Sequence, residues 1–514
     1  MKKILIKPGV YYDSVKLLLL SKETGERAGI RRAMVAMATA TNLEILSRLG
    51  WSAEDAGGAG DNDLLIAVEA EDGAVLDSTF EWLEGRLKQR ASAAAAAYRP
   101  RTLRRAIQDH PSANLVQISI PGAYAFREAK RALEGGRHVM LFSDNVPVDE
   151  EVALKDLAAE RGLLLMGPDC GTAILNGVCL GFANVVPRGP VGIVAASGTG
   201  AQEVSALLAR LGVGVSQVIG TGGRDLSGDV DGRMMRLGLR ALREDPGTRV
   251  VVLVSKPPEP KVGEKILAEA QAAGKPVVVN FLGEDPDRIS GGNIRGARTL
   301  EEAAHLAFRS VTGRDETAEI LGPCACATLE ERSKFKAGQR YLRGLFVGGT
   351  LADEAMLMLK DSLGTLHSNG PVAGCLPLRD AGRSTGHTVL DLGADEFTVG
   401  RAHPMIDPTL RNLRIVEEAR DPEVAVLLLD VVLGYGSHPD PAGETAGAVE
   451  QARAAAEADG RWLAVVASVC GTEGDPQDLK EQEIALGRAG VRVFASNAEA
   501  CRFCAALLPG GADG

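Results

Sequence analysis

A turn from an apolar strand into a helix occurs twice in this chain, at residues 197–203 and again at residues 348–354. Each copy follows a short apolar run, and each precedes a segment whose apolar residues recur at helical spacing. Glycines and a hydroxyl side chain at a helix start leave backbone N–H groups, with the positive end of the helix dipole, directed at one point. Each turn is therefore predicted to hold an anion, and phosphate suits it best.

The two copies correspond residue by residue at one offset. The corresponding pairs are Gly198 and Gly349, Thr199 and Thr350, Ala201 and Ala352, and Glu203 and Glu354. The strands that follow repeat in the same order, which predicts an internal duplication. A single Gly-Thr pair before a helix is also an ordinary helix cap. The recurrence favours function over capping, and two such helix starts that face each other would hold one phosphoryl group from both sides.

Predicted strands alternate with amphipathic helices along nearly the whole chain of 514 residues. This alternation is typical of α/β layers around parallel sheets. It begins at the N-terminus, where strands are predicted at residues 3–6, 32–37 and 63–68. The predicted domains are residues 1–98, 99–188, 189–315 and 340–510.

Charge and composition exclude several classes of partner. The net charge is −11, and no run of Lys or Arg is interleaved with aromatic residues, so no nucleic-acid partner is predicted. The apolar stretch at residues 15–20 is too short for a membrane span or a signal core, which predicts a cytoplasmic protein with no membrane partner. The 8 cysteines are scattered, so we expect reduced thiols and no metal site.

Ligands of open α/β sheets gather beyond the carboxyl ends of the strands. In the second predicted domain these ends carry turns at residues 121–124, 143–145 and 167–172. The residues predicted there to bind a cofactor are Pro121, Gly122, Asp169, Cys170 and Gly171. In the third domain Lys256 follows a strand at residues 250–254 and is placed to meet an anion at the rim. Its alternative role is that of a solvated loop lysine.

A third candidate group lies within residues 398–408. Arg401 is suited to bind a carboxylate and His403 to transfer a proton, with Asp407 close by in sequence. The alternative is that His403 and Asp407 only cap the helix that begins after Pro408. Function is favoured, because two X-Pro turns and three polar groups are costly to place there for structure alone.

Several strings, taken together, resemble a known family. The α subunit of succinyl-CoA synthetase is similar, in order, at residues 167–171, 197–199, 222–225 and 275–277. FdrA, an acyl-CoA-synthetase-like family, is the closer match and is similar at residues 167–172, 255–258, 399–412, 471–473 and 475–476. The resemblance covers essentially the whole chain. It implies an α/β fold with a Rossmann-like CoA-binding region followed by two flavodoxin-like ligase domains.

The chain departs from the synthetases at their phosphate carrier. Such enzymes carry phosphate on a histidine in a Gly-His-Ala-Gly-like string, supported by a glutamate. The matching residues 290–297 contain no histidine, and Ser255 and Lys256 stand where the glutamate is expected. Without an imidazole there is no phosphoryl carrier. Direct acyl transfer between an amide or thioester and inorganic phosphate needs no carrier, and backbone N–H groups would stabilise its oxyanion.

The FdrA resemblance implies such a transfer, by a subunit of oxamate carbamoyltransferase in allantoin degradation. That enzyme converts oxalurate and phosphate to oxamate and carbamoyl phosphate. The residues expected to hold phosphate are Ser197, Gly198, Thr199, Gly348, Gly349 and Thr350. Lys256 would offset charge, Arg401 would pair with the substrate carboxylate, and His403 would be the acid or base. The alternatives are an acyl-CoA synthetase subunit that binds CoA along the rim and works with a separate subunit, and a non-catalytic scaffold.

Overall fold

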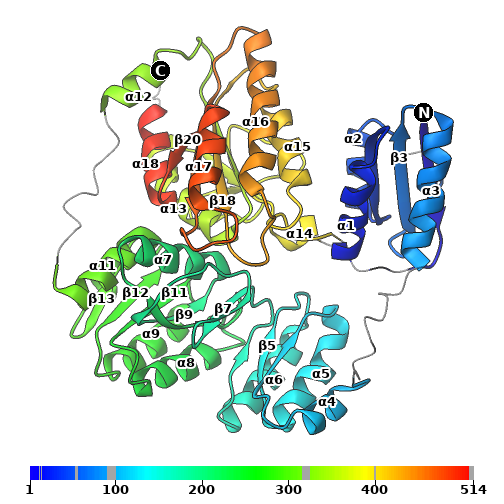
Figure 1. Ribbon diagram of the computed structural model, residues 1–514. Coiled ribbons are helices and arrows are strands. Elements are labelled where there is room, and N and C mark those ends of the chain that lie inside the picture. Colours follow the sequence, from blue (N-terminus) through cyan, green and yellow to red (C-terminus); the bar gives the residue numbers. More distant parts are fainter. Residues whose placement is uncertain are drawn as a thin grey trace. The chain divides into compact units, whose positions relative to one another are not determined.

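The computed structural model describes residues 1–10, 12, 14–52, 56–88, 100–314, 325–398 and 401–508. Contacts divide the chain into two compact units (Figure 1): unit 1 is Met1–Arg99 with Leu392–Leu410, and unit 2 is Pro100–Asp391 with Arg411–Gly514. The boundary predicted after residue 98, and positions 399 and 400 of the FdrA-like stretch, lie outside the described residues. Within the described part of the chain, no helix is long and apolar enough to cross a membrane.

Unit 1 contains a three-stranded sheet in the order β1-β3-β2. The strands are β1 (Lys2–Lys7), β2 (Ile30–Met37) and β3 (Leu64–Ala70), and the helices are α1 (Ser14–Gly25), α2 (Ala40–Arg48) and α3 (Gly73–Lys88). Side chains of α1, α3 and the sheet form one buried core, with Leu17, Ile66 and Leu83 at its centre.

The prediction of a parallel sheet is wrong for this region, because β3 runs antiparallel to both of its neighbours. Alternating strands and helices do not by themselves fix strand direction. Residues 38–63 connect β2 to β3 and include the helix α2 of 9 residues. The chain enters β3 at the end of the sheet where β2 finishes, so the two strands are antiparallel.

Unit 2 begins with a parallel three-stranded sheet in the order β4-β5-β6. Its elements are α4 (Leu103–Asp109), β4 (Leu115–Ile118), α5 (Gly122–Glu134), β5 (His138–Leu141), α6 (Val148–Glu160) and β6 (Leu165–Met166). A buried lysine ties α6 to the next part of the chain: Lys155 Nζ lies 2.8 Å from a carboxylate oxygen of Asp225 and donates to the carbonyl of Thr221. The synthetase-like string at residues 222–225 thus has a structural role.

The first seven-stranded sheet has the order β13-β12-β11-β9-β10-β7-β8. Its strands are β7 (Thr172–Leu175), β8 (Val178–Gly181), β9 (Arg188–Ala196), β10 (Val215–Gly220), β11 (Val250–Ser255), β12 (Val277–Phe281) and β13 (Ile294–Gly296). Its helices are α7 (Gly198–Arg210), α8 (Arg233–Glu244), α9 (Pro260–Gln271), α10 (Pro286–Ile289) and α11 (Leu300–Thr312). Strands β9 to β13 are parallel, and the β7–β8 hairpin adds an antiparallel edge.

The second seven-stranded sheet is parallel throughout, in the order β16-β15-β17-β14-β18-β19-β20. Its strands are β14 (Tyr341–Phe346), β15 (Leu366–Ser368), β16 (Leu376–Pro377), β17 (His387–Asp391), β18 (Val424–Val432), β19 (Ala464–Cys470) and β20 (Arg492–Phe494). The helices from α12 onward are α12 (Ala325–Arg332), α13 (Gly349–Leu363), α14 (Asp395–Thr398), α15 (Thr409–Glu418), α16 (Pro441–Ala458), α17 (Leu479–Arg488) and α18 (Asn497–Leu507).

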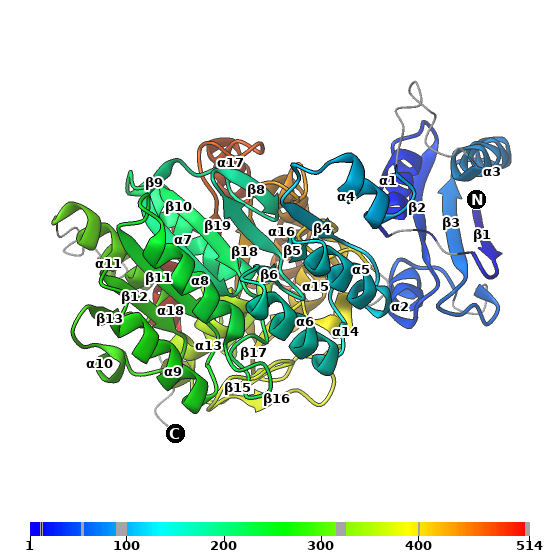
Figure 2. The same cartoon turned by 90° about the horizontal axis from the view of Figure 1, so that it is seen from below.

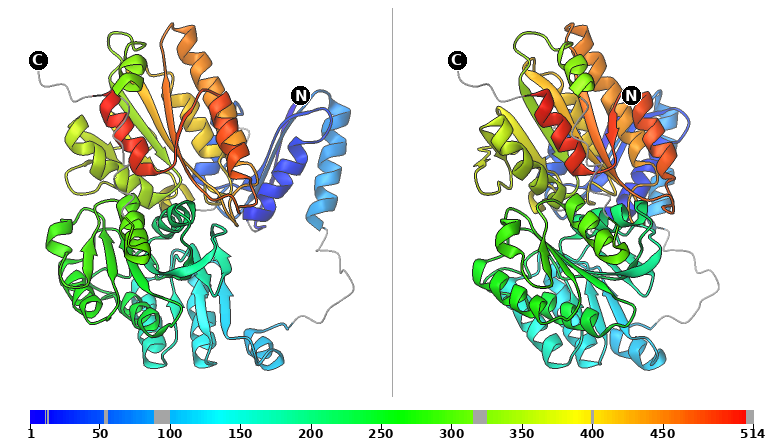
Figure 3. Two further views of the ribbon diagram at one scale, coloured as in Figure 1. Left: turned by 60° about the vertical axis from the view of Figure 1, so that its left-hand side comes forward. Right: turned by 90° about the vertical axis from the view of Figure 1, so that its left-hand side faces the viewer.

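The two large sheets share one plan, as the predicted duplication requires. In each, the strand before the phosphate-type turn lies in the middle: β9 between β10 and β11, and β14 between β17 and β18. Helices α8 and α9 cover one face of the first sheet, and α7 and α11 cover the other (Figure 2). In unit 2 the helices α7 and α11 pack against α13 and α18, between the two sheets (Figure 3).

Two buried glutamates join these helices across the duplication. Glu203 of α7 accepts a hydrogen bond of 3.0 Å from the backbone N–H of Asn497, the first residue of α18. Glu354 of α13 accepts one of 2.7 Å from the N–H of Leu300, the first residue of α11. Each half thus caps a helix of the other half. Burial raises the pKa of both carboxyls to about 7.

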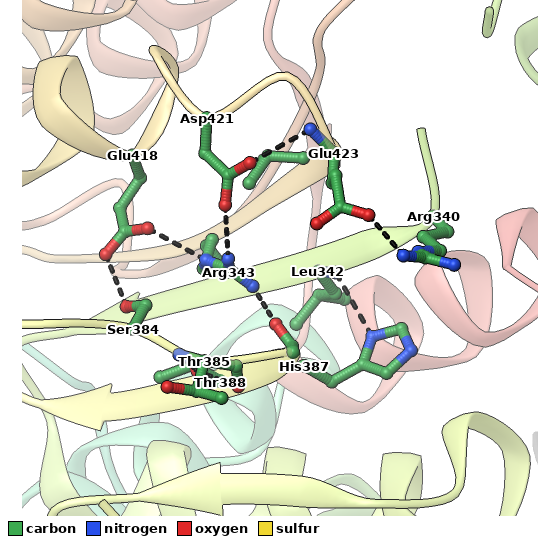
Figure 4. A network of polar contacts seen from close by, with 12 residues as sticks. Arg340, Leu342, Arg343, Ser384, Thr385, His387, Thr388, Glu418, Asp421 and Glu423 are labelled. Atoms are coloured by element: carbon green, nitrogen blue, oxygen red, sulfur yellow. Dashed lines mark hydrogen bonds and ion pairs between the residues drawn. The ribbon is translucent and has the colours of Figure 1, made fainter. Parts of the chain in front are cut away.

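A polar network lies near the beginning of β14, away from the turn that follows this strand (Figure 4). Buried Arg343 pairs with Glu418 and Asp421, each at 2.8 Å. Glu418 is also held by Arg414 at 2.6 Å and by the hydroxyl of Ser384. Every charge in the network has an opposite partner, so the network ties β14 to the end of α15 and plays a structural part.

Candidate functional site

The start of α7 is capped by its own side chain. Ser197 adopts an extended backbone conformation, and its Oγ accepts a hydrogen bond of 2.9 Å from the N–H of Gly200. A Cβ on Gly200 would lie 2.5 Å from this oxygen, which explains the glycine. The strand before it, β9, is buried in its last six residues. The turn capped by the Ser197 hydroxyl therefore follows directly on a buried strand and lies at the rim of the sheet.

The start of α13 is closed by carboxylates instead. Asp430, fully buried in β18, accepts hydrogen bonds of 2.8 Å from the N–H groups of Val347 and Gly348. Asp391, at the end of β17, lies so close that a Cβ on Gly349 would be 2.4 Å from its Oδ2. Burial raises the pKa of Asp430 to about 6, against the effect of Arg411 at 3.8 Å. Two acidic groups thus lie where the sequence predicted an anion.

The structure brings the two helix starts together. The hydroxyl oxygens of Ser197 and Thr350 lie 2.6 Å apart, in hydrogen-bond contact. A Cβ on Gly348 would lie 2.9 Å from the methyl carbon of Thr199, so the two turns are in van der Waals contact as well. Both belong to unit 2. The turns therefore meet face to face, and their role in holding phosphate stays a prediction.

Lys256 lies between the two halves, after β11, and pairs with Asp353 of α13 at 2.9 Å. Its side chain is 42% exposed. Desolvation lowers the pKa of Lys256, but Asp353, followed by Asp391, outweighs that effect, and the net shift is upward. The lysine stays charged, and its charge is already balanced by a neighbour.

Thr172, the first residue of β7, closes the rim turn predicted at residues 167–172, but it was not among the residues predicted to bind a ligand. Its Oγ1 is buried and has no hydrogen-bond partner among the described residues. A Cβ on Gly198 would lie 3.3 Å from this oxygen, so the hydroxyl borders the start of α7. The sequence analysis also missed Asp391 and Asp430. Asp391 and Asp430 are polar residues in the otherwise largely apolar strands β17 and β18, and an inspection of the polar residues of such strands would have found them.

The predicted cofactor rim is assembled by hydrogen bonds between its turns. The N–H of Ile120 donates to Ser143 Oγ at 3.1 Å, and the N–H of Asp169 donates to the Ser143 carbonyl at 2.9 Å. Gly122, at the start of α5 after Pro121, is packed so closely that a Cβ would lie 2.2 Å from the carbonyl of Asp144.

Cys170 takes part in this rim from inside the core. Its thiol is 3.5 Å from the carbonyl oxygen of Thr172, and burial raises its pKa to about 12. The side chain is therefore a packing group, and any ligand here would contact backbone. The backbone conformation of Asp169, with φ of 55°, fits a tight turn, and Gly171 beside it is half-buried. Binding of CoA at this rim stays a prediction.

Arg401 and His403 belong to unit 1, whereas the paired turns belong to unit 2. Arg401 is held by Asp407 at 2.8 Å. Asp407 also accepts from the N–H of Thr409 at 3.1 Å, which is the capping role given above as its alternative. His403 Nδ1 accepts from the N–H of Met405 at 3.2 Å, and burial lowers its pKa to about 4. The imidazole is therefore neutral at pH 7 and has a local structural contact.

The turn that matches the histidine string closes on itself. Ser290 Oγ donates to the carbonyl of Pro286 at 2.8 Å and accepts from the N–H of Gly296 at 2.9 Å. Arg295 donates to the carbonyl of Gly292 at 3.2 Å. These contacts fix the loop in place, and its sequence offers no imidazole. The site is thus that of an acyl-CoA-synthetase-like protein that has the two glycine- and hydroxyl-containing turns and lacks the histidine in this string.

Comparisons with known proteins agree with this class. Residues 345–507 match the CoA-ligase family, residues 188–283 match the CoA binding domain, and residues 1–101 match a domain described as AllF, heavy metal-associated. YahF of Escherichia coli (strain K12) is 44% identical over 495 residues, which are 96% of each chain. The chain therefore belongs to the FdrA-like family of acyl-CoA-synthetase-like proteins, together with YahF. The predicted α/β fold class, with CoA-binding and ligase-like domains, is confirmed.

Two ligase subunits show a more distant similarity. The ADP-forming sulfoacetate-CoA ligase subunit SauD of Bilophila wadsworthia is 28% identical over 35% of this chain and 63% of its own length. The ADP-forming succinate–CoA ligase subunit alpha 2 of Archaeoglobus fulgidus is 32% identical over 32% of this chain and 58% of its own length. The chain thus spans less than two thirds of either ligase subunit.

The match to a heavy metal-associated domain can be tested against the residues present. Soft metal ions are bound mainly by cysteine and histidine. Residues 1–101 contain neither residue type. Among the residues that the structure describes, no group of three or more His, Cys, Asp or Glu side chains is arranged to hold a metal ion. The N-terminal domain of this chain therefore does not fit a heavy metal.

Proposed function

We propose that this chain is the subunit of an acyl-CoA-synthetase-like enzyme that handles an acyl phosphate, with the phosphoryl group held at the start of α7. The observation that carries the proposal is the contact of 2.6 Å between the hydroxyls of Ser197 and Thr350. It brings donors from both halves of the duplication to one helix start. Phosphate would replace this mutual contact by accepting a hydrogen bond from each hydroxyl.

The start of α7 is the better half of the site for an anion. It lacks a neighbouring carboxylate cap, since Ser197 caps it with a hydroxyl. The unpartnered hydroxyl of Thr172 borders it and offers a further donor. At α13, Asp430 already takes two N–H groups, and like charges there would repel phosphate. In this proposal α13 contributes Thr350 rather than its backbone.

The chemistry that these groups support is transfer of an acyl group to or from phosphate. A phosphate oxygen attacks the carbonyl carbon, the bond from that carbon to nitrogen or sulfur breaks, and the leaving group takes a proton. Backbone N–H groups at the helix start and Lys256 would stabilise the negative charge of the phosphate and of the transition state. The pair of Lys256 with Asp353 keeps this cation at the junction of the halves.

Two acceptor chemistries are candidates. The matches to the CoA-ligase family and the CoA binding domain support thioester formation with CoA, together with a separate subunit. The turn at residues 290–297, which is closed and lacks a histidine, favours the second candidate: direct carbamoyl transfer between oxalurate and phosphate, as in oxamate carbamoyltransferase. CoA would supply the thiol in the first case, with phosphate as the leaving group, and phosphate would be the co-substrate in the second.

The experiment uses the complex that copurifies with the full chain. Carbamoyl phosphate formed from oxalurate and phosphate would establish the second candidate, and a CoA thioester formed from an acid, CoA and nucleotide would establish the first. In the carbamoyl transfer the double substitution S197A/T350V should lower kcat/KM for phosphate by roughly 100-fold, because two hydrogen bonds to a charged ligand are lost. In the ligase reaction, which releases phosphate, the same loss should appear in kcat/KM for phosphate measured in the reverse direction.

A matched control exists in the same part of the chain. Ser216 and Thr248 form another buried hydroxyl pair at 2.6 Å, at the end of the first large sheet where β10 and β11 begin. The variant S216A/T248V loses the same kind of contact and should keep its kinetics. Equal kinetics for wild type and S197A/T350V would remove the proposed site, and equal losses in both variants would assign the effect to stability.

A further inference from the structure

Unit 1 contains a cavity of about 100 Å³ that the proposed function does not use. It is partly open, and it is lined by residues of α1, β2 and α2 and of the segment at residues 401–409. Most of its wall is aliphatic, with Leu17, Val35 and Ile45 among the lining residues. Its charged residues, Arg401 and Asp407, come from the 401–409 segment, and α1 and α2 add the neutral polar residues Ser14, Ser21 and Asn42. The cavity is therefore an apolar pocket with one charged end.

The charged end has an unused hydrogen-bond donor. The side chain of Arg401 is only 6% exposed, and its Nη2 is held by Asp407 at 2.8 Å. Its Nη1 is buried and has no hydrogen-bond partner among the described residues. The other oxygen of Asp407 is occupied by the hydroxyl and the N–H of Thr409. One arm of the guanidinium is thus fixed, and the other is left without an acceptor beside a cavity.

A buried donor without an acceptor destabilises a protein, so such a group calls for a partner. Arginine binds carboxylate oxygens in preference to most other groups, because its planar N–H donors match their geometry and charge. The cavity volume suits a molecule of a few heavy atoms, and the aliphatic wall suits a short hydrocarbon body. The N-terminal domain also lacks the cysteine and histidine that its heavy metal-associated relatives' description would call for.

We propose that unit 1 binds a short-chain aliphatic monocarboxylate in this cavity, with Arg401 Nη1 donating to the carboxylate and Asp407 holding the guanidinium in place. The site is built from residues of unit 1 alone. It therefore does not rest on the phosphate turns, which belong to unit 2. It goes beyond the proposed function by giving the domain at residues 1–101 a ligand of its own.

The test is isothermal titration of the full chain with acetate, propionate and butyrate. Affinity should rise by about fourfold for each added methylene until the cavity is full, because each buried methylene leaves water. Propionamide, which has the same shape and no charge, should bind at least tenfold more weakly than propionate. Failure of all three acids to bind the wild type, or equal binding of propionamide, would overturn the proposal.

Substitutions separate the site from general stability. R401Q should abolish propionate binding, while R86Q should leave it unchanged. Arg86 is a matched control, since it is also an ion-paired arginine of unit 1, at 2.6 Å from Glu23, and does not line the cavity. A36L fills part of the cavity from β2 and keeps Arg401. It should weaken the binding of butyrate more strongly than the binding of acetate. If R401Q melts at the same temperature as wild type and still binds propionate equally well, the proposed site is contradicted.

Discussion

The start of α7 is capped by its own hydroxyl, whereas the start of α13 is capped by carboxylates from neighbouring strands. Ser197 satisfies the N–H of Gly200, and Asp430 satisfies those of Val347 and Gly348. The two turns arose from one pattern and still touch through Ser197 and Thr350. They therefore differ in electrostatics rather than in backbone plan. The two sheets supply two similar helix starts, and side chains from adjacent strands give those starts different surroundings.

The largest expected effect is on the pH dependence of stability, and it concerns the buried glutamate that each of the two helices carries. Glu203 and Glu354 occupy corresponding positions, and burial raises the pKa of both to about 7 from an ordinary 4.5. A carboxyl whose folded-state pKa is raised contributes stability that is complete below about pH 4.5 and is lost as the pH rises through about 7. Relative to E203Q or E354Q, the wild type should lose on the order of 3 kcal/mol per carboxyl between pH 5 and pH 8.

Urea unfolding of each variant and of wild type at pH 5 and pH 8 measures this difference. E302Q is the control, because the Glu302 carboxylate also accepts a hydrogen bond from a backbone N–H, that of Arg298, but in an exposed contact. A gap between wild type and E203Q that stays constant with pH would show that this carboxylate is not held in the neutral form. Different pH responses of E203Q and E354Q would show that the likeness of the two helices is only geometric.

A smaller effect should separate the two turns directly. A Cβ on Gly349 would lie 2.4 Å from Asp391 Oδ2, whereas a Cβ on Gly198 would find Thr172 Oγ1 at 3.3 Å as its nearest neighbour. G349A should therefore cost about 1–3 kcal/mol of unfolding free energy through overpacking. G198A should stay within about 1 kcal/mol of wild type, since alanine also favours the helix. Chemical unfolding of both variants gives the comparison, and equal costs would mean that the turns are equally crowded.

Sequence reasoning found the parts of the fold that depend on local pattern. The strands around Val191 and Leu345, the helices after them and the offset between their turns all follow from hydrophobic periodicity and glycine placement. The direction of β3 did not follow, because the pattern of alternating elements is the same for a crossover and for a return from the same end. The parallel prediction failed for that reason.

The candidate site was only half predictable for a related reason. Ser197 and Thr350 were found from their own turns, but the acids that close α13 come from β17 and β18, and only the register between these strands and β14 places them there. The assignment of Arg401 and His403 to unit 1 likewise depends on which residues their segment packs with. Sequence spacing carries no information on such long-range contacts.

The smallest expected effect on stability tests whether the start of α7 is the open one. The hydroxyl of Thr172 is buried and has no partner among the described residues, so T172V removes no hydrogen bond from the free protein. Replacing an unsatisfied hydroxyl by a methyl group of the same shape should change the unfolding free energy by less than about 1 kcal/mol, in the stabilising direction. If phosphate is held beside Gly198, the same change removes a donor to a charged ligand and should weaken phosphate binding by roughly tenfold.

Phosphate titration and urea unfolding of T172V should thus give changes in opposite directions: weaker phosphate binding and slightly higher stability. A stabilised T172V that binds phosphate as well as wild type does would place the anion elsewhere, and it would leave the hydroxyl cap of Ser197 as the whole difference between the two helix starts.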